Sequence, residues 1–311
     1  MLWPLLIFGC GGLELSQSWQ LDRVRILAVR PFVDVETDPV LGTRAEPEPG
    51  ETVRFEALTY APPDEPVGGV LWSACLLDDA IGQCDFESDD LDESGLTEDG
   101  SGIIGIEPFL NPTWNIPADA LDSLTDTEKQ EGRSALINVI AIPEDIFEDE
   151  DLFSADTDKT DQLSELDPNA FEIAFKRMPI SLAETPNHNP DIVNIVVAGH
   201  PIGSAKGFTA RTKKTYTLEP ILANGHIETY AFINNSGEKE YRTEEPYFSW
   251  YTELGAEDPK KGAEFDQPVS LYPYSSVEWT APDKPGWITI YVVARDRRGG
   301  MGWRTISVNV L

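Results

Sequence analysis

The sequence is poor in the residues that most often carry catalysis and metal binding. Its 311 residues include only three cysteines and three histidines. The histidines, His188, His200 and His226, show neither the HxH nor the HExxH spacing of metal sites. A Gly-x-Ser-x-Gly elbow and a Gly-rich phosphate loop ending in Gly-Lys-Ser/Thr are also missing. Acidic pairs are so numerous that none stands out as a glycosidase pair, so we predict that the protein is not an enzyme.

Basic residues are scarce, mainly in the first part of the chain. Residues 1–190 hold 40 of the 55 acids but 10 of the 23 Lys and Arg, a net charge of −30, whereas residues 191–311 sum to −2. No basic residue lies between Arg54 and Lys129. A field of this sign repels nucleic acid and attracts cations or basic partners. We therefore expect no nucleic-acid partner.

The amino terminus lacks an apolar run long enough to span a bilayer as a helix. Leu2–Phe8 looks like the end of a signal-peptide core, although no Lys or Arg precedes it. Ile7-Phe8-Gly9-Cys10 resembles the bacterial lipobox, in which the chain is cut before a cysteine that is then lipidated. The resemblance implies a lipid anchor on Cys10, a signal and tether over residues 1–18, and a cell-envelope location, with Gly11 compatible with the outer membrane. A buried strand with an ordinary core cysteine is the alternative.

The cysteine count agrees with export. Lipidation of Cys10 leaves Cys75 and Cys84 as a pair that closes a short loop. A disulfide between them is stable only in an oxidising compartment such as the periplasm. Metal binding by the two thiols is the rival interpretation, but they lack CxxC spacing and have no histidine nearby.

The two halves of the chain carry the same landmarks in the same order. Each has a strand centred on a tryptophan, Trp72 or Trp250, and then a Trp-x-x-Pro segment, at Trp114 or Trp279. An apolar strand follows, at 135–142 or 287–294, and a last strand at 171–178 or 303–310. Short strands with alternating faces must bury one side, and packing two sheets face to face does so. Trp72 and Trp250 are therefore predicted core residues.

This pattern resembles bacterial immunoglobulin-like domains of cell surfaces, including the polycystic-kidney-disease-type repeat. Those domains also end in a hairpin of the form strand–Asp-x-x-Gly–strand, which matches the turn Arg295–Gly300. Asp22–Arg30 and Trp72–Cys75 further resemble a group of uncharacterised bacterial lipoproteins. The resemblance implies an all-β fold of two immunoglobulin-like β-sandwich domains in tandem, over residues 19–183 and 191–311. The short, Pro-bounded linker 184–190 is expected to hold them at a semi-rigid angle.

The first domain is expected to carry two acidic insertions, residues 76–106 and 143–168. Clustered carboxylates offer the hard oxygen ligands that calcium prefers, although their spacing fails the EF-hand pattern. Solvated acidic loops are the alternative. The candidate calcium ligands are Asp85, Asp89, Asp90 and Asp92 in the first insertion and Asp156, Asp158 and Asp161 in the second, and no other cofactor is expected.

These patterns predict a non-catalytic envelope lipoprotein that acts as a structural or binding module, in contact with the membrane and with a protein partner or surface assembly. Two alternatives stay open. One is a calcium-dependent adhesive or matrix protein whose acidic loops order on metal. The other is a carbohydrate-binding accessory module or enzyme, with aromatic side chains such as Trp287 and Trp303 stacking on sugars.

Overall fold

The protein is an all-β molecule. The computed structural model describes residues 18–33, 41–77, 96–97, 100–107, 112–144, 171–203, 207–234, 236–255 and 259–311. The helices that lie wholly within these ranges are one short α-helix, α1 (Asp126–Glu131), and one 3-10 turn at Pro259–Lys261. None of the helices described is long and apolar enough to cross a bilayer. The predicted fold class, all-β and built of sandwiches, is confirmed.

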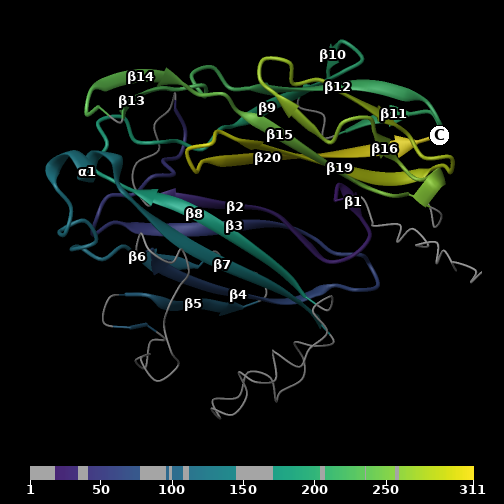
Figure 1. Ribbon diagram of the computed structural model, residues 1–311. Helices are drawn as coiled ribbons and strands as arrows, with labels where there is room; N and C mark the ends of the chain where they lie inside the picture. The colour runs from purple at the N-terminus through teal and green to yellow at the C-terminus, as the bar shows by residue number, and fades with distance from the viewer. Residues whose placement is uncertain are drawn as a thin grey trace, which may run out of the picture.

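The first sandwich joins a three-stranded and a four-stranded sheet (Figure 1). Both sheets contribute side chains to a single buried core. The smaller sheet has the order β2 (Arg25–Val33), β3 (Thr52–Tyr60), β6 (Thr113–Asn115), and the larger has the order β5 (Gly102–Glu107), β4 (Val67–Leu76), β7 (Arg133–Pro143), β8 (Glu172–Ile180).

The second sandwich repeats this order with additional strands. In place of β2-β3-β6 it has β9-β12-β18, and in place of β4-β7-β8 it has β15-β19-β20. The repeat predicted from the sequence landmarks is therefore confirmed by strand order. One sheet consists of β10 (His200–Pro201), β9 (Ile192–Val197), β12 (Thr215–Leu222), β18 (Val277–Thr280) and β16 (Glu264–Phe265), and the other of β1 (Gln20–Leu21), β15 (Tyr247–Glu253), β19 (Gly286–Arg295), β20 (Met301–Val310) and β11 (Gly207–Ala210), with β17 (Val269–Leu271) beside β15.

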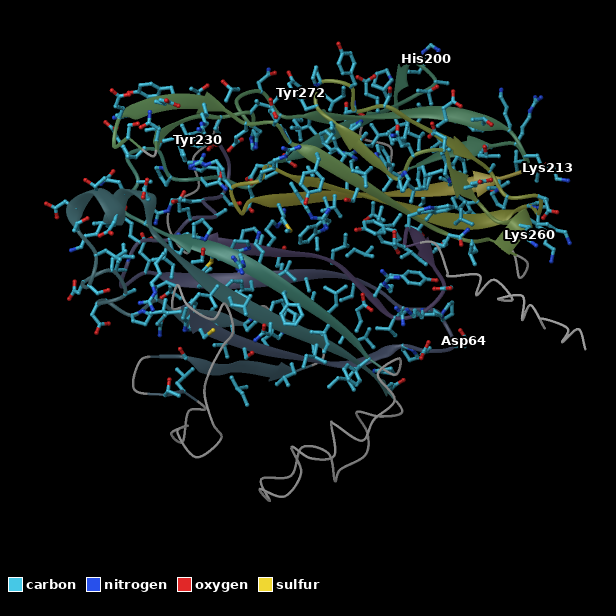
Figure 2. The ribbon with its side chains drawn as sticks, viewed as in Figure 1. Asp64, His200, Lys213, Tyr230, Lys260 and Tyr272 are labelled. Atoms are coloured by element: carbon cyan, nitrogen blue, oxygen red, sulfur yellow. The ribbon has the colours of Figure 1, made fainter. Side chains whose placement is uncertain are left out.

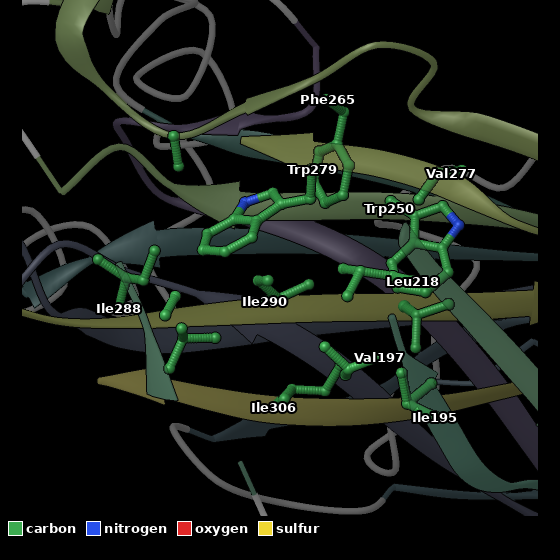
Figure 3. Packing of buried hydrophobic residues seen from close by; sticks show 14 of the residues in the cluster. Ile195, Val197, Leu218, Trp250, Phe265, Val277, Trp279, Ile288, Ile290 and Ile306 are labelled. Carbon is green, nitrogen blue, oxygen red and sulfur yellow. The ribbon is translucent and has the colours of Figure 1, made fainter. Parts of the chain in front are cut away.

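Tryptophans occupy equivalent places in the two cores. Trp72 and Trp114 are buried in the first, and Trp250 and Trp279 in the second, as predicted for the strand-centred pair. Figure 3 shows Trp250, Trp279 and Phe265 packed over the aliphatic side chains of β19 and β20. Burying a large aromatic ring stabilises such a core by several kcal/mol, roughly 3–5 on truncation to alanine.

The segment that precedes β2 differs from expectation. The sequence pattern predicts one continuous approach from Trp19 to Arg30 into the first sandwich. Instead β1 pairs in parallel with β15 of the second sandwich, and the Thr252 N–H donates to the Trp19 carbonyl at 3.1 Å. The Trp19 ring lies edge-on to Phe265, 5.8 Å between centroids, inside the second core. Burial of this indole draws the segment away from β2.

Two further segments differ from the sequence interpretation. Residues 227–233 are expected as an early strand of the second sandwich, but β13 (Thr229–Ile233) pairs only with β14 (Lys239–Thr243) in a separate ribbon. Figure 1 shows this ribbon at the end of the molecule that carries α1. Part of the range expected as the insertion 76–106 forms β5, whose run Gly-Ile-Ile-Gly-Ile suits a strand better than a solvated loop.

Candidate functional site at the junction of the sandwiches

Most of the site residues predicted from sequence lie outside the described residues. Cys75 is described, and it is buried in β4 beside Leu77 and Leu136. The lipid anchor, the disulfide and the calcium sites therefore remain predictions. In the part of the chain that the structure describes, no group of three or more His, Cys, Asp or Glu side chains is placed to hold a metal. The predicted site residues that lie outside the described ranges are Cys10, Cys84, Asp85, Asp89, Asp90, Asp92, Asp156, Asp158 and Asp161.

The two sandwiches lie side by side, with β2 against the sheet of β15, β19 and β20 (Figure 1). The centre of this contact is apolar, because Leu21, Leu27, Ala28 and Val293 form a buried cluster there. At its edge the rings of Tyr60 and Tyr291 meet at 6.3 Å, and burial raises the pKa of both phenols to about 12.

The two tryptophans considered for sugar stacking have different surroundings. Trp303 belongs to the junction, where the Arg30 guanidinium lies 4.1 Å from its ring centre. Trp287 is 72% exposed. Of these two tryptophans, only Trp287 is open to a ligand. The two rings therefore do not form one stacking platform.

The linker is built into the junction through two buried asparagines. Asn187 Nδ2 donates to Asp296 Oδ2 at 3.0 Å, and the Asn187 carbonyl accepts from Ala45 N–H at 2.8 Å. Asn189 Nδ2 donates to the Pro31 carbonyl at 2.7 Å, and its Oδ1 accepts from Met301 N–H at 2.9 Å. Each asparagine therefore bonds to both sandwiches, which ties the linker down more firmly than its prolines alone would.

The β19–β20 turn is held by Asp296. Its Oδ1 accepts the backbone N–H groups of Arg298, Gly299 and Gly300 at 2.7, 3.0 and 3.0 Å. A Cβ on Gly300 would lie 2.0 Å from Asp296 Oδ2 and 2.6 Å from the His188 carbonyl, so only glycine fits. The predicted Asp-x-x-Gly turn is thus confirmed, and it packs against the linker instead of facing solvent.

Arg298 at the tip of this turn is the centre of a buried charge network. Its Nη1 donates to Glu228 Oε2 at 3.0 Å and to Glu244 Oε1 at 3.1 Å. Its Nη2 donates to the Thr185 carbonyl at 2.9 Å and to Glu46 Oε2 at 3.4 Å. The guanidinium also lies 4.2 Å from the centre of the Tyr230 ring, which Figure 2 labels on the α1 side of the second sandwich. One cation therefore joins the first sandwich, the linker and the β13–β14 ribbon.

The network holds more acid than base, and burial shifts the ionisation of its members. Burial raises the pKa of Glu244 to about 7, and it also raises the pKa of Asp296. On the other side of the turn, Lys176 from β8 donates to the Gly299 carbonyl, and burial lowers the pKa of this lysine to about 8. We therefore expect the ionisation of the junction to change close to neutral pH.

A carboxyl group with a pKa near 7 is the kind of group that catalyses proton transfer, but Glu244 is already engaged. Its side chain is only 2% exposed, one oxygen accepts from Arg298 and the other accepts from the Glu228 N–H at 3.1 Å. Structural ion-pair networks shift pKa values in the same way. The geometry therefore fits a structural clamp better than an acid–base site.

Sequence reasoning missed this network. Glu46, Asn187, Asn189, Glu228 and Glu244 carry no motif, and their partners lie tens to hundreds of positions away in the chain. The one available signal was the Asp-x-x-Gly turn, which the sequence pattern identifies only as a hairpin turn.

Comparisons with known proteins add little to this geometry. No protein-family model and no curated protein matches the chain. It is similar to a nucleoside hydrolase-related hypothetical protein from Saccharophagus degradans that is associated with carbohydrate metabolism, at 16% identity over 40% of this chain and 26% of that one, with a TM-score of 0.26. It is also similar to fibronectin(III)-like modules of CbhA from Clostridium thermocellum, at 10% identity over 90% of this chain and 93% of that one, with a TM-score of 0.25.

The chain thus spans about a quarter of the length of the first of these proteins and nearly all of the second. At identities and TM-scores this low, neither similarity carries an activity, a substrate or a partner over to this chain. What the protein does must be argued from its own residues.

Proposed function

We propose that the protein is a non-catalytic envelope lipoprotein, whose two sandwiches form one rigid structural or binding module. The junction carries this proposal. Domains that share only a linker move relative to each other unless their interface is large and apolar. Here an apolar cluster, two buried asparagines and the Arg298 network all cross the same boundary. Rigidity of this kind suits a module that holds a surface at a fixed angle.

The position of β1 supports anchoring through the amino terminus. Ser18, where the described part of the chain starts, lies eight positions after Cys10. Figure 1 shows β1 at the same end of the molecule as the carboxyl terminus, and Figure 2 labels Lys213 and Lys260 at that end. A lipid on Cys10 would turn this end of the molecule toward the membrane.

Intact mass of the protein extracted from membranes, before and after reduction, tests the anchor. We expect a mature chain that begins at Cys10, carries acyl groups, and gains two hydrogens when the Cys75–Cys84 disulfide is reduced. A full-length chain without acyl groups and with free thiols would remove the envelope location, and the rigid two-sandwich module would stand alone.

The calcium-dependent alternative stays a prediction, because all seven of its candidate ligands lie outside the described residues. Calorimetry at calcium concentrations up to the millimolar range, where weak extracellular sites bind, tests it directly. Absence of a heat signal there would remove it.

A further inference from the structure

A positively charged cavity crosses the junction of this otherwise acidic protein. Its volume is about 310 Å³, and it is lined by Ser134 and residues of β8 from the first sandwich and by Tyr247, Arg295 and residues 297–301 from the second. Five of its twelve lining residues are basic and none is acidic, although acids outnumber bases 55 to 23 in the chain. Such a concentration of one sign attracts anions. The five are Lys176, Arg177, Arg295, Arg297 and Arg298.

Three of these cations are already bound within the protein. Arg298 serves the acidic network, and Lys176 donates to the Gly299 carbonyl. Arg295 donates to Ser249 Oγ at 2.9 Å and to the Leu27 carbonyl at 2.8 Å. Arg177 and Arg297 differ, because both are exposed and neither guanidinium group has a hydrogen bond or ion pair with any residue in the described ranges. Two guanidinium groups at the cavity are therefore left for an external acceptor.

The backbone at Arg297 gives a second, independent indication. Its φ is +73°, in the left-handed region that favours glycine and asparagine. Holding an arginine there costs about 1–2 kcal/mol. Backbone strain of this kind is concentrated at ligand sites, where it positions a side chain. Here it places a guanidinium beside the cavity.

Aromatic rings flank these two arginines. Phe175 is 70% exposed and precedes Arg177 by two positions on β8, so both side chains lie on the same face of the strand. The guanidinium carbons of Arg295 and Arg297 lie 5.7 and 5.9 Å from the centre of the Tyr247 ring. An anion-binding pair beside an exposed aromatic ring fits a ligand that carries a carboxylate on a ring with an apolar C–H face.

The surrounding charge limits the size of such a ligand. Residues 1–190 carry a net charge of −30, which repels a long polyanion such as nucleic acid. The cavity volume lies at the lower end of the range for small-molecule sites, about 300–1,000 Å³. A compact ring with one acidic group satisfies both limits.

We propose that this cavity binds an acidic sugar, whose carboxylate pairs with Arg177 and Arg297 and whose ring packs on Phe175. This deepens the binding role proposed above by naming a ligand class, and it does not depend on the lipid anchor. The sugar can be a free monosaccharide or one residue of a glycan, since both present the same chemistry.

Calorimetric titration of the full chain with galacturonate and with its linear trimer tests the proposal and distinguishes these two sources. We expect at least one of them to bind, with neutral galactose not binding, and binding to weaken as salt is raised because the pairing is electrostatic. Arg177→Gln and Arg297→Gly should each weaken binding about tenfold or more, the value of one charge-assisted hydrogen bond. Arg177→Gln should keep the melting temperature, since this side chain does not support the fold, and Arg297→Gly should keep or raise it, because glycine relieves the strain at this positive φ.

Two controls separate an acidic-sugar site from a simple anion site. Phe175→Ala should weaken binding of the sugar, whereas Arg211→Ala, at an exposed arginine outside the cavity, should not change it. The proposal is overturned if neither acid binds, if inorganic sulfate binds as tightly as both acids, or if Phe175→Ala has no effect. Failure here leaves the module role intact, because that role is tested by the cooperativity of unfolding described below.

Discussion

Arg298 shows how one side chain can hold several segments together. Among the described cations it alone contacts all three of Glu46, Glu228 and Glu244. Glu46 belongs to the first sandwich, whereas Glu228 and Glu244 flank the β13–β14 ribbon. Removing one partner of a buried ion pair leaves uncompensated charge, which costs about 3–5 kcal/mol. The network therefore stabilises the junction only as long as it is complete.

We expect Arg298→Ala to lower the free energy of unfolding by about 3–5 kcal/mol, because the buried carboxyl groups of Glu46, Glu228 and Glu244 lose their shared hydrogen-bond and ion-pair partner. Urea denaturation at pH 7 measures this. Arg211→Ala is the matched control, and an exposed arginine should cost no more than about 0.5 kcal/mol. Equal losses of unfolding free energy for the two substitutions would contradict a stabilising role of the Arg298 network.

The raised pKa of Glu244 makes the stability of the protein depend on pH near neutrality. In the folded chain this carboxyl has a pKa of about 7, against an ordinary value of 4.5, so between these pH values folding takes up a proton. Stability must then fall as pH rises through this window. Burial also raises the pKa of Asp296, so this group changes the stability with pH in the same direction.

Glu244→Gln should remove part of this pH dependence, because glutamine resembles the protonated acid. Denaturation midpoints at pH 5 and pH 8 should differ less in the variant than in the unchanged protein. Its exposed neighbour provides the control, since Glu245→Gln should leave the difference as it was. A Glu244→Gln protein with the full pH dependence would show that other groups cause it.

At the scale of elements, β1 pairs with β15 of the second sandwich, whose other strands come much later in the chain. Trp19→Ala should destabilise the second sandwich by about 3–5 kcal/mol, because the indole fills its core beside Phe265. Differential scanning calorimetry measures the loss. Trp287→Ala, at a tryptophan that is 72% exposed, should have little effect. Similar losses for both would mean that Trp19 is not part of this core.

The strands were predictable because their signals are local. Alternation over Val53, Phe55 and Ala57, and the tryptophans of β4 and β15, identify core-facing positions from neighbouring residues alone. The contact of β1 with β15 was not predictable, because Gln20-Leu21 and Thr252-Glu253 lie more than 200 positions apart. The contacts at the junction could not be predicted for the same reason, since Asn187 and Asp296 have no feature that marks them as partners.

At the scale of the whole molecule, the two sandwiches should unfold as one unit. Calorimetry of the unchanged protein should show a single transition. Gly300→Ala should divide it into two, because the added Cβ lies 2.0 Å from Asp296 Oδ2 and forces the turn away from the linker. Gly237→Ala is the control, with φ at +76° but open space around it, so it should cost only about 1 kcal/mol and keep one transition. Two transitions in the unchanged protein would argue against a rigid module.

The place of β1 also dictates an order of events during synthesis. Its partner β15 ends at Glu253, so more than 200 residues must follow Leu21 before the two strands can meet. At roughly 5–20 residues per second this takes on the order of 10–50 seconds. Throughout that interval Trp19 has no native partner and contacts solvent or whatever carries the nascent chain. The earliest described segment to be made is thus among the last to reach its native neighbours, and a delay downstream would lengthen the exposure of its indole.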